Sequence, residues 1–592
     1  MDDTPTPSRR TRTKKSWGEK SRRERGVVLV WFALMLTVLL GFAGFAVDLS
    51  NWWFQAERLQ KAADAGAHAG VVFLPADLTG ATSTARNEVQ KNGYKTTGLG
   101  SNGTLVVTQE PNPNRLRVRV TTKVPSFFVG LLGVNDVTLT REAVAEYISP
   151  VPMGSPENKL GNDPEQNQVS AQFWMNIAGP KSTKASGDRY QAKTCGSSVA
   201  GCNTSNDEYN AEGYTFALKV TNVPSNQPLN VQIYDPAMVY VNDTCGANLP
   251  SAAERTTLVG FGNRTGVGGL NYADANDRYA GGVTKWCTGD QDIEGRGNRT
   301  TYLVRAPDAT PWSDTDNPVL CSTTMPSFNP GVNGEPTIFQ YLNPTDGIQD
   351  NEALVNPSDN VWTFAEVFRR NVNICSIPSS TLASLPQGGK GDFILQIRTN
   401  ADPPPADPKT YNPARNDGGH NRFSVQAGFG TAGLVALNGN DVSINARGRM
   451  SLYANADGAD TRFYLARVLP YDAGRTLRVT LFDMGDASAP GTLQILPPAE
   501  YASSFSGCSF SKDDGGGMST NASTCTITNV SSNTGFQGRS VNIDIPIPAN
   551  YTCTQTALTG CWIKVRADFD SGVTDTTTWS AAILGNPIRL VE

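Results

Sequence analysis

The chain has 592 residues, too many for one hydrophobic core, and its 57 glycines and 37 prolines predict many turns between short strands. Residues 1–25 carry nine Lys or Arg and four acidic residues, a charge of +5, so the total of −5 leaves −10 for the rest. Nucleic acid attracts basic surfaces, and an acidic body of this kind excludes a nucleic-acid-binding protein.

An uncharged apolar run, residues 27–47, follows the basic tail directly. As a helix it extends about 30 Å, the thickness of the hydrocarbon layer of a bilayer, so we predict a transmembrane helix. Basic residues stay on the cytoplasmic side of such a helix. This rule predicts a single-pass protein of the cell membrane, with a cytoplasmic tail at 1–25 and extracytoplasmic C-terminal domains.

The alternative for this run is a cleaved secretory signal. Gly44 and Ala46 have the small-residue spacing that a signal peptidase recognises. The run is longer than an ordinary signal core, however, and it continues without a break into a second helical stretch. Both properties favour a permanent anchor.

The helical pattern continues to about residue 73, before Pro75. Along this part, residues recur at three- and four-residue spacing to form a stripe of mostly small side chains: Leu59, Ala62, Ala63, Gly66, Ala67 and Gly70. Such a stripe lets another helix approach closely, as Gly41 and Gly44 would allow inside the bilayer. It equally suits an anchor that packs on its own domain, and the sequence leaves both interpretations open.

Residues 48–148 have the pattern of an α+β module. A short helix is predicted at 84–94, ended by Gly93. Alternating apolar and polar residues predict three strands, at 104–110, 115–124 and 136–148. The apolar segment 125–133, between the last two strands, is expected to be a short helix or a hairpin arm. The composition of residues 149–164 is that of a linker.

The N-terminal part of the chain resembles the TadE/TadG-like Flp (tight adherence) pilus-assembly proteins. Their pattern is a basic tail, Arg-Gly, an apolar span ending in Ala-Val-Asp, and a helix with Leu-Gln-x-Ala-Ala-Asp-Ala. The matching residues here are Arg25, Gly26, Ala46, Val47, Asp48, Leu59, Gln60, Ala62, Ala63, Asp64 and Ala65. The similarity covers about residues 20–148. It implies a membrane-anchored pilus-assembly protein with a pilin-like module at 26–148.

Two departures from the family pattern refine this expectation. Pilin-type members that prepilin peptidase cleaves carry Glu at the fifth position after the cleavage Gly, whereas Gly26 is followed at that position by Trp31. This predicts a permanent anchor, closer to the TadG-like branch. TadG-like proteins often end in a von Willebrand A-type domain with an Asp-x-Ser-x-Ser metal motif. The nearest string, residues 486–490, lacks the second Ser, which argues against that domain.

The remainder contains an internal repeat. Residues 214–235 align without gaps on residues 462–483, and both segments contain a stretch with the period of two that a half-buried strand shows. We therefore predict two copies of a mainly-β, sandwich- or jelly-roll-like domain, at 165–430 and 435–592. The first copy carries an insertion at 245–355. It is interpreted either as a set of binding loops or as one elaborate loop stapled by disulfides.

All ten cysteines lie on the predicted extracytoplasmic side, where an even number indicates a disulfide framework. The disulfide candidates are Cys195, Cys202, Cys245, Cys287, Cys321, Cys375, Cys508, Cys525, Cys553 and Cys561. Local spacing suggests the pairs Cys195–Cys202, Cys508–Cys525 and Cys553–Cys561. The other four leave two bonds whose connectivity the sequence does not decide. The sequence lacks the clustered Cys-x-x-Cys or Cys/His spacing that a zinc site needs.

The sequence offers no catalytic constellation. A hydrolase triad or a His-ligated metal would need His68 or His420, and neither lies in a supporting motif; His420 is expected to cap a turn. Acidic turns at 313–318, 416–423 and 455–463 could alternatively supply Ca²⁺ ligands. The preference of Asp, Asn and Gly for turns explains these residues without a metal ion. We therefore predict a protein that is not an enzyme and has no cofactor or metal site.

Three functions remain as hypotheses. The first is a structural or assembly protein of a Tad/Flp-type pilus or related cell envelope assembly, with the lipid bilayer and envelope proteins as partners. The second is a surface adhesin or glycan-binding protein with the same anchor, using aromatic residues of the insertion such as Tyr279, Trp286 and Trp312. The third and weakest is an exported hydrolase.

Overall fold

A computed structural model describes most of the chain, and the chain forms two compact units. The described residues are 20–74, 77–98, 101–148, 150–161, 173–196, 199–239, 298–307, 314–328, 367, 371–399, 418–431, 435, 441–457, 461–485, 487, 489–501, 503–554, 556, 558–569, 572–585 and 588–591. The first unit consists of residues 1–147 and 587–592, and the second of residues 148–586.

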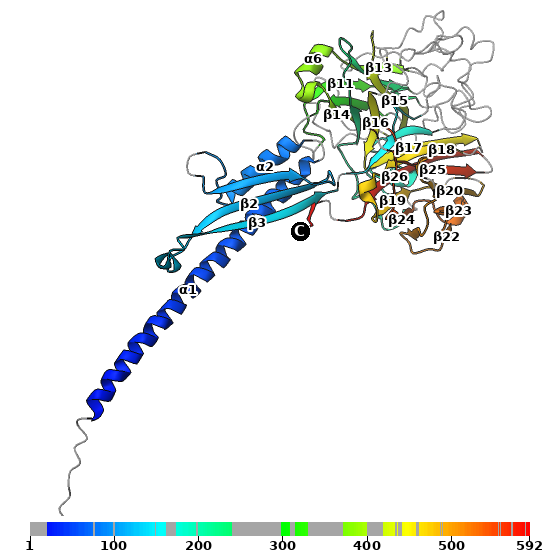
Figure 1. Ribbon diagram of the computed structural model, residues 1–592. Helices are drawn as coiled ribbons and strands as arrows, with labels where there is room; N and C mark the ends of the chain where they lie inside the picture. Colours follow the sequence, from blue (N-terminus) through cyan, green and yellow to red (C-terminus); the bar gives the residue numbers. More distant parts are fainter. Residues whose placement is uncertain are drawn as a thin grey trace, which may run out of the picture. The chain divides into compact units, whose positions relative to one another are not determined.

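A single long helix, α1 (Lys20–Gly70), dominates the first unit and ends in the 3₁₀ turn η1 (Val71–Phe73) (Figure 1). The apolar side chains from Val27 to Val47 are exposed, as in Leu29, which is 70% exposed. This helix is long and apolar enough to cross a membrane. Its C-terminal half instead buries the apolar side chains of one face, beginning at Ala56. One continuous helix thus combines an uncovered apolar half with a half that belongs to a folded core.

The buried half of α1 packs on a sheet and on a second helix. The sheet has the antiparallel order β1-β2-β3-β27, and its elements are β1 (Gly103–Gln109), β2 (Arg115–Pro125), β3 (Asp136–Tyr147) and β27 (Ile588–Leu590). The second helix is α2 (Leu78–Lys91), whose N-cap Asp77 accepts a hydrogen bond from the Gly80 N–H at 2.8 Å. The three predicted strands are present, and α2 begins six residues before the predicted helix.

The stripe of small residues on α1 faces its own unit. Ala62, Ala63 and Ala67 are fully buried in one core with residues of α2, β2 and β3. A Cβ atom at Gly70 would lie 2.7 Å from the Ala81 carbonyl oxygen on α2, so this glycine permits the close helix contact. In the described part of the chain, the stripe therefore serves intramolecular packing.

We expect Gly70→Val to destabilise the first unit by about 1–3 kcal/mol, because the added side chain has no space between α1 and α2. Gly41→Val is the matched control on the same helix, since a Cβ at Gly41 meets no atom within 4 Å. Chemical unfolding of the detergent-solubilised protein measures the difference. Equal stability of the two variants would contradict this packing.

The last strand of the chain belongs to the first unit, which corrects the predicted boundary of the second β-domain at residue 592. β27 pairs with β3, with Arg589 opposite Glu146. The Arg589 Nη2 atom lies 2.7 Å from the Glu146 carboxylate, which is fully buried and also pairs with Arg115 at 3.2 Å. The sequence did not indicate this pairing because β3 is remote from β27 along the chain. The three residues of β27 are also too few to show a strand pattern.

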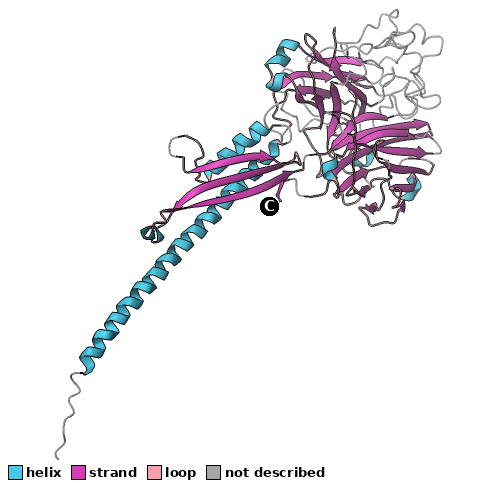
Figure 2. Cartoon of the chain, in the orientation of Figure 1, coloured by secondary structure: helices cyan, strands magenta, loops and turns pink. Residues whose placement is uncertain are grey.

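The second unit is built almost entirely of strands (Figure 2). One sheet has the order β11-β10-β14-β7-β16-β4-β18-β25-β20-β23-β22, and the other has the order β13-β8-β15-β6-β17-β26-β19-β24-β21, with β5 paired to β15. The strands of the first sheet are β4 (Pro152–Ser155), β7 (Tyr214–Val220), β10 (Thr300–Arg305), β11 (Val319–Met325), β14 (Gly391–Arg398), β16 (Val442–Arg447), β18 (Thr461–Arg467), β20 (Gly491–Leu496), β22 (Ser519–Asn521), β23 (Thr526–Val530) and β25 (Trp562–Phe569). The strands of the second are β5 (Lys159–Leu160), β6 (Phe173–Ala178), β8 (Leu229–Tyr234), β13 (Asn371–Ile377), β15 (His420–Phe429), β17 (Arg449–Asp457), β19 (Thr476–Phe482), β21 (Ser509–Lys512), β24 (Ser540–Pro546) and β26 (Gly572–Ile583).

Smaller elements complete the described chain. A separate parallel pair is formed by β9 (Met238–Val239) and β12 (Ser327–Phe328), and one short helix is α6 (Ser379–Ser384). The 3₁₀ turns are η2 (Val129–Leu132), η4 (Lys184–Ser186), η7 (Pro386–Gly388), η8 (Pro470–Asp472) and η9 (Ser532–Thr534).

Residues that we predicted as a linker are partly built into the second unit. β4 and β5 lie within 149–164, and Met153 and Leu160 on these strands are buried. β4 occupies the position between β16 and β18. The prediction was wrong for 152–160, because the polar and turn-forming residues around these two short strands mask their apolar positions.

Four disulfides lie in the described chain. Three are the local pairs, Cys195–Cys202, Cys508–Cys525 and Cys553–Cys561. The fourth, Cys321–Cys375, joins β11 to β13, the outermost strands of the two sheets at one edge. Cys508–Cys525 connects the segments that lead into β21 and β23, near the opposite edge. Each outer edge therefore has a covalent link between the sheets.

Candidate membrane-anchoring site

The point where α1 meets the β2–β3 hairpin is organised by one carboxylate. Asp48 lies directly after the apolar run and is fully buried. Its two oxygens accept hydrogen bonds from the backbone N–H groups of Phe127, Phe128 and Val129, at 2.7, 2.8 and 2.6 Å. Three charge-assisted bonds of this kind fix the start of the η2 turn on the helix.

The hairpin follows the helix beyond this point. Asn51 Nδ2 donates to the Pro125 carbonyl at 3.5 Å, and further along α1 the Gln60 side chain donates to the Glu142 carbonyl at 3.1 Å. β2 and β3 therefore run along α1, with the turn η2 at the end nearer the helix N-terminus (Figure 1). In the opposite direction, a Cβ atom at Gly44 would lie 2.8 Å from Cγ of Phe128. The Phe128 ring therefore packs directly against Gly44, and a larger residue at position 44 would displace it.

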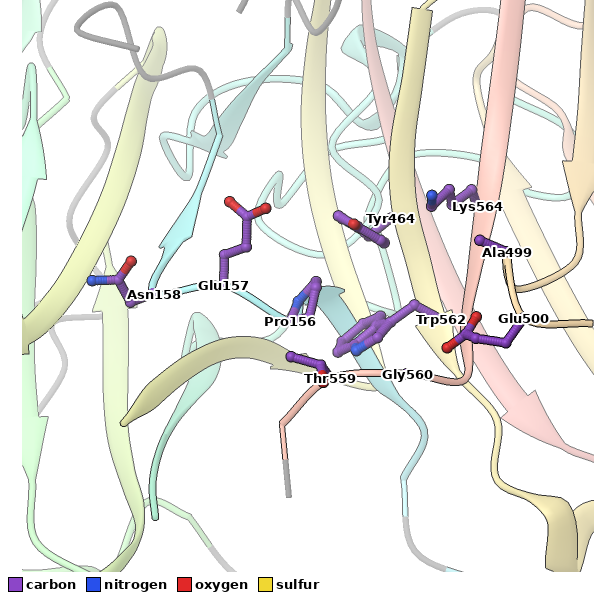
Figure 3. A pocket seen from close by; sticks show the side chains of 10 residues that line it. All are labelled: Pro156, Glu157, Asn158, Tyr464, Ala499, Glu500, Thr559, Gly560, Trp562 and Lys564. Atoms are coloured by element: carbon purple, nitrogen blue, oxygen red, sulfur yellow. The ribbon is translucent and has the colours of Figure 1, made fainter. Parts of the chain in front are cut away.

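The second unit contains a pocket of about 390 Å³ beside β18 and β25 (Figure 3). Tyr464, Trp562 and Lys564 line it together with Glu157 and Glu500. The Lys564 ammonium lies 5.0 Å from the centre of the Tyr464 ring. The Tyr464 and Trp562 rings form a T-shaped pair with a centroid distance of 5.9 Å. Burial, followed by the two carboxylates, raises the pKa of the Tyr464 phenol. The arrangement suits a small polar ligand that offers hydrogen bonds.

His420 does not cap a turn, which corrects our expectation. It is the first residue of β15 and is fully buried, and its Nδ1 atom lies 3.1 Å from the Asn176 side-chain oxygen. Burial, with a further contribution from Arg422, lowers the pKa of His420 to about 3. The imidazole is therefore a neutral core residue.

This burial predicts acid sensitivity. An unfolded His titrates near pH 6.5, so above that pH the neutral ring imposes no penalty, and stability falls as the pH drops from 6.5 toward 3. We expect the second unit to lose about 1.4 kcal/mol per pH unit from this residue below pH 6. Denaturant unfolding at pH 7, 6 and 5 measures this slope. His420→Gln should have a flatter slope than the unsubstituted protein, and identical slopes would disprove the assignment.

The other candidate residues from the sequence lie apart or outside the described chain. Asp314, in one acidic turn, pairs with Arg447 at 3.0 Å. No group of three or more His, Cys, Asp or Glu that could hold a metal ion occurs among the described residues, and the Ca²⁺ alternative stays a prediction. Residues outside the described ranges include Cys245, Cys287, Tyr279, Trp286, Trp312, Asp486, Ser488, most of the basic tail and most of the predicted insertion.

One family model matches the N-terminal part of the chain. Residues 26–76 match the family model described as "Putative Flp pilus-assembly TadE/G-like". The TadE/G-like segment spans the whole apolar run, Asp48 and the small-residue stripe. The match does not separate the two branches of the family, so the TadG-like assignment stays a prediction. No curated protein and no solved structure matches the chain.

Sequence reasoning included Asp48 in the family pattern but missed what it does. The position of Asp48 could have indicated a hydrogen-bonding role. A carboxylate at the end of an apolar span is costly unless it is hydrogen-bonded. The role of the 125–135 turn was also missed, since no sequence rule relates that turn to residue 48.

Proposed function

We propose that this chain is a single-pass, membrane-anchored structural protein of a Tad/Flp-type pilus or related envelope assembly. The observation that carries the proposal is the coincidence of the TadE/G-like segment, residues 26–76, with the exposed apolar half and the packed half of α1. The charge of the basic tail supports a cytoplasmic N-terminus, with residues 48–592 on the other side of the membrane. The matched family suggests a structural role and not a catalytic one.

The first unit would be the pilin-like part of this protein. A helix whose N-terminal half is uncovered and whose C-terminal half packs on an antiparallel sheet suits both insertion into a bilayer and lateral assembly. The second unit would present its sheets and loops to envelope partners. Contacts of this kind use exposed edges and loops.

The second unit would consist of two repeated domains that share their sheets. In the sequence repeat, β7 and β8 correspond to β18 and β19. β7 and β18 flank the pair β16–β4 in the first sheet, and β8 and β19 each lie two strands from the pair β6–β17 in the second. Asp235 and Asp483, which align in the repeat, both end these strands with a left-handed φ, 55° and 60°. At the centre, β4 and β16 each pair with a strand of the other half. This exchange supports a duplication followed by fusion of the sheets.

Co-purification tests the proposal. The tagged full-length protein is solubilised in mild detergent from cells that express Tad components, and bound proteins are identified by mass spectrometry. A chimera with an unrelated apolar helix in place of residues 27–47 is the matched control for simple membrane residence. We expect Tad assembly proteins to be enriched with the natural chain over an unrelated single-pass protein. No enrichment under any mild condition would reject the association.

The pocket beside β18 and β25 favours a second candidate, a surface protein that binds glycans. The carboxylates and the lysine around the tyrosine ring could accept hydrogen bonds from sugar hydroxyls and donate to them. Glycan-array binding by the full protein, lost in Tyr464→Ala and retained in a variant of the exposed Lys390, would support this candidate. Absence of binding to any glycan would remove it.

A further inference from the structure

The turn between β2 and β3 exposes a group of large apolar side chains that the fold leaves uncovered. Phe127 and Phe128 are 61% and 50% exposed, and Leu131 and Leu132 on η2 are 85% and 84% exposed. Soluble proteins rarely leave such a contiguous patch in water, so the patch indicates a binding partner.

The chemistry of the turn contrasts with that of the hairpin behind it. Residues 125–135 contain no charged side chain. The strands beyond it carry ion pairs, with Arg117 and Arg119 both bonded to Glu142, at 2.8 and 2.7 Å. The charges therefore stop where the apolar turn begins. This division matches a boundary between water and hydrocarbon.

The level of the turn along α1 identifies the partner. Phe128 packs at Gly44, three residues before the end of the apolar run, which is roughly 4–5 Å inside it along the helix. The exposed side chains of Leu40 and Val47, four residues before and three residues after Gly44, are its neighbours on the same face of α1. The apolar surface of the turn is thus continuous with the helix surface that the proposed anchor turns toward lipid.

The hydrogen bonds of Asp48 allow its carboxylate and the 125–135 turn to lie at the edge of the hydrocarbon layer. A carboxylate at the edge of the hydrocarbon layer is costly when it lacks partners. Its three backbone N–H donors come from the turn itself, so the turn encloses the carboxylate and presents Phe127 and Phe128 outward. Trp52 and Trp53, one helical turn further on, lie at the level that aromatic residues occupy among lipid headgroups.

We propose that residues 125–135 enter the outer leaflet of the bilayer beside α1, so that the first unit contacts lipid through the anchor helix and through this turn. The inference rests on the membrane anchor of the proposed function. With two contacts, the unit cannot rotate freely about the helix axis. The sheet then keeps a constant orientation toward neighbouring proteins in the membrane plane.

Site-directed fluorescence on the full-length protein in phosphatidylcholine vesicles tests this inference. An environment-sensitive dye is attached to Leu131→Cys and, separately, to Leu132→Cys, both exposed enough to leave the fold unchanged. Thr108→Cys, exposed on β1 near the other end of the sheet, is the matched control. Leu36→Cys in the apolar run reports insertion of the anchor, and the unsubstituted protein measures background labelling.

We expect blue-shifted emission at 131 and 132 that lipid-borne quenchers suppress, and unshifted, unquenched emission at 108. Quenching at 36 without quenching at 131 and 132 would overturn the inference and leave the anchor intact. A blue shift at 131 and 132 that resists lipid quenchers would also overturn it, because protein would then cover the turn. Absence of quenching at 36 would reject the anchor itself.

Discussion

Removal of Cys321–Cys375 is expected to destabilise the second unit by about 4 kcal/mol. The cysteines are 54 residues apart, and a crosslink over that distance strongly restricts the unfolded chain. The bond also joins β11 and β13, the outermost strands of the two sheets. A hydrogen bond from the Thr323 hydroxyl to the Ile374 carbonyl, at 3.0 Å, connects the same two strands beside it. Cys321→Ser/Cys375→Ser should therefore loosen this edge first.

The matched control is Cys195→Ser/Cys202→Ser, whose cysteines are only seven residues apart. The same dependence of disulfide stabilisation on loop length gives a loss of about 2 kcal/mol for this shorter loop. Denaturant unfolding of both double variants, followed by hydrogen exchange in β11 and β13, separates the two effects. A larger loss from the short loop, or unchanged protection of β11, would contradict the role of the edge bond.

Deletion of residues 588–592 is expected to destabilise the first unit by about 3 kcal/mol. The deletion removes three paired residues of β27, each backbone bond contributing about 1 kcal/mol. It also removes Arg589 from the buried Glu146 carboxylate, which then keeps Arg115 and Asn112 as partners. The edge of β3 becomes free to pair with other chains, so we expect aggregation as well.

Arg589→Leu is the control for this deletion, because it keeps the strand and removes only the ion pair, at a cost of about 1 kcal/mol for a half-exposed arginine. Hydrogen exchange at residues 145–147 measures protection of the β3 edge. If the deletion leaves that protection and the unfolding midpoint unchanged, β27 is not part of this sheet in solution.

The sequence predicted local structure well where one pattern extends over many residues. The anchor run, the alternating strands at 104–148 and the helix to residue 73 all follow from periodicity, and their observed bounds are close to the predicted ones. The short-range disulfides follow from spacing. The family resemblance, too, depends on a contiguous segment, residues 26–76.

What the sequence did not predict depends on pairings between distant residues. β27 joins β3 across residues 148–586, and β4 joins strands of the other half of its unit. Both strands are short and have no pattern of their own. Asp48 belongs to the same class, since its partners lie 79–81 residues away and are backbone groups, which have no sequence signature.

The central claim is that the apolar run crosses a membrane and leaves residues 48–592, with the sheet of the first unit and the whole second unit, on the outer side. Membrane-impermeant biotinylation of lysines, mapped by mass spectrometry in spheroplasts or protoplasts and in inverted vesicles, tests it without any mutation. We predict that the exposed Lys123, Lys219 and Lys390 are labelled only from outside, and that Lys14 and Lys15 are labelled only in inverted vesicles. Labelling of both groups from the same side would contradict the account.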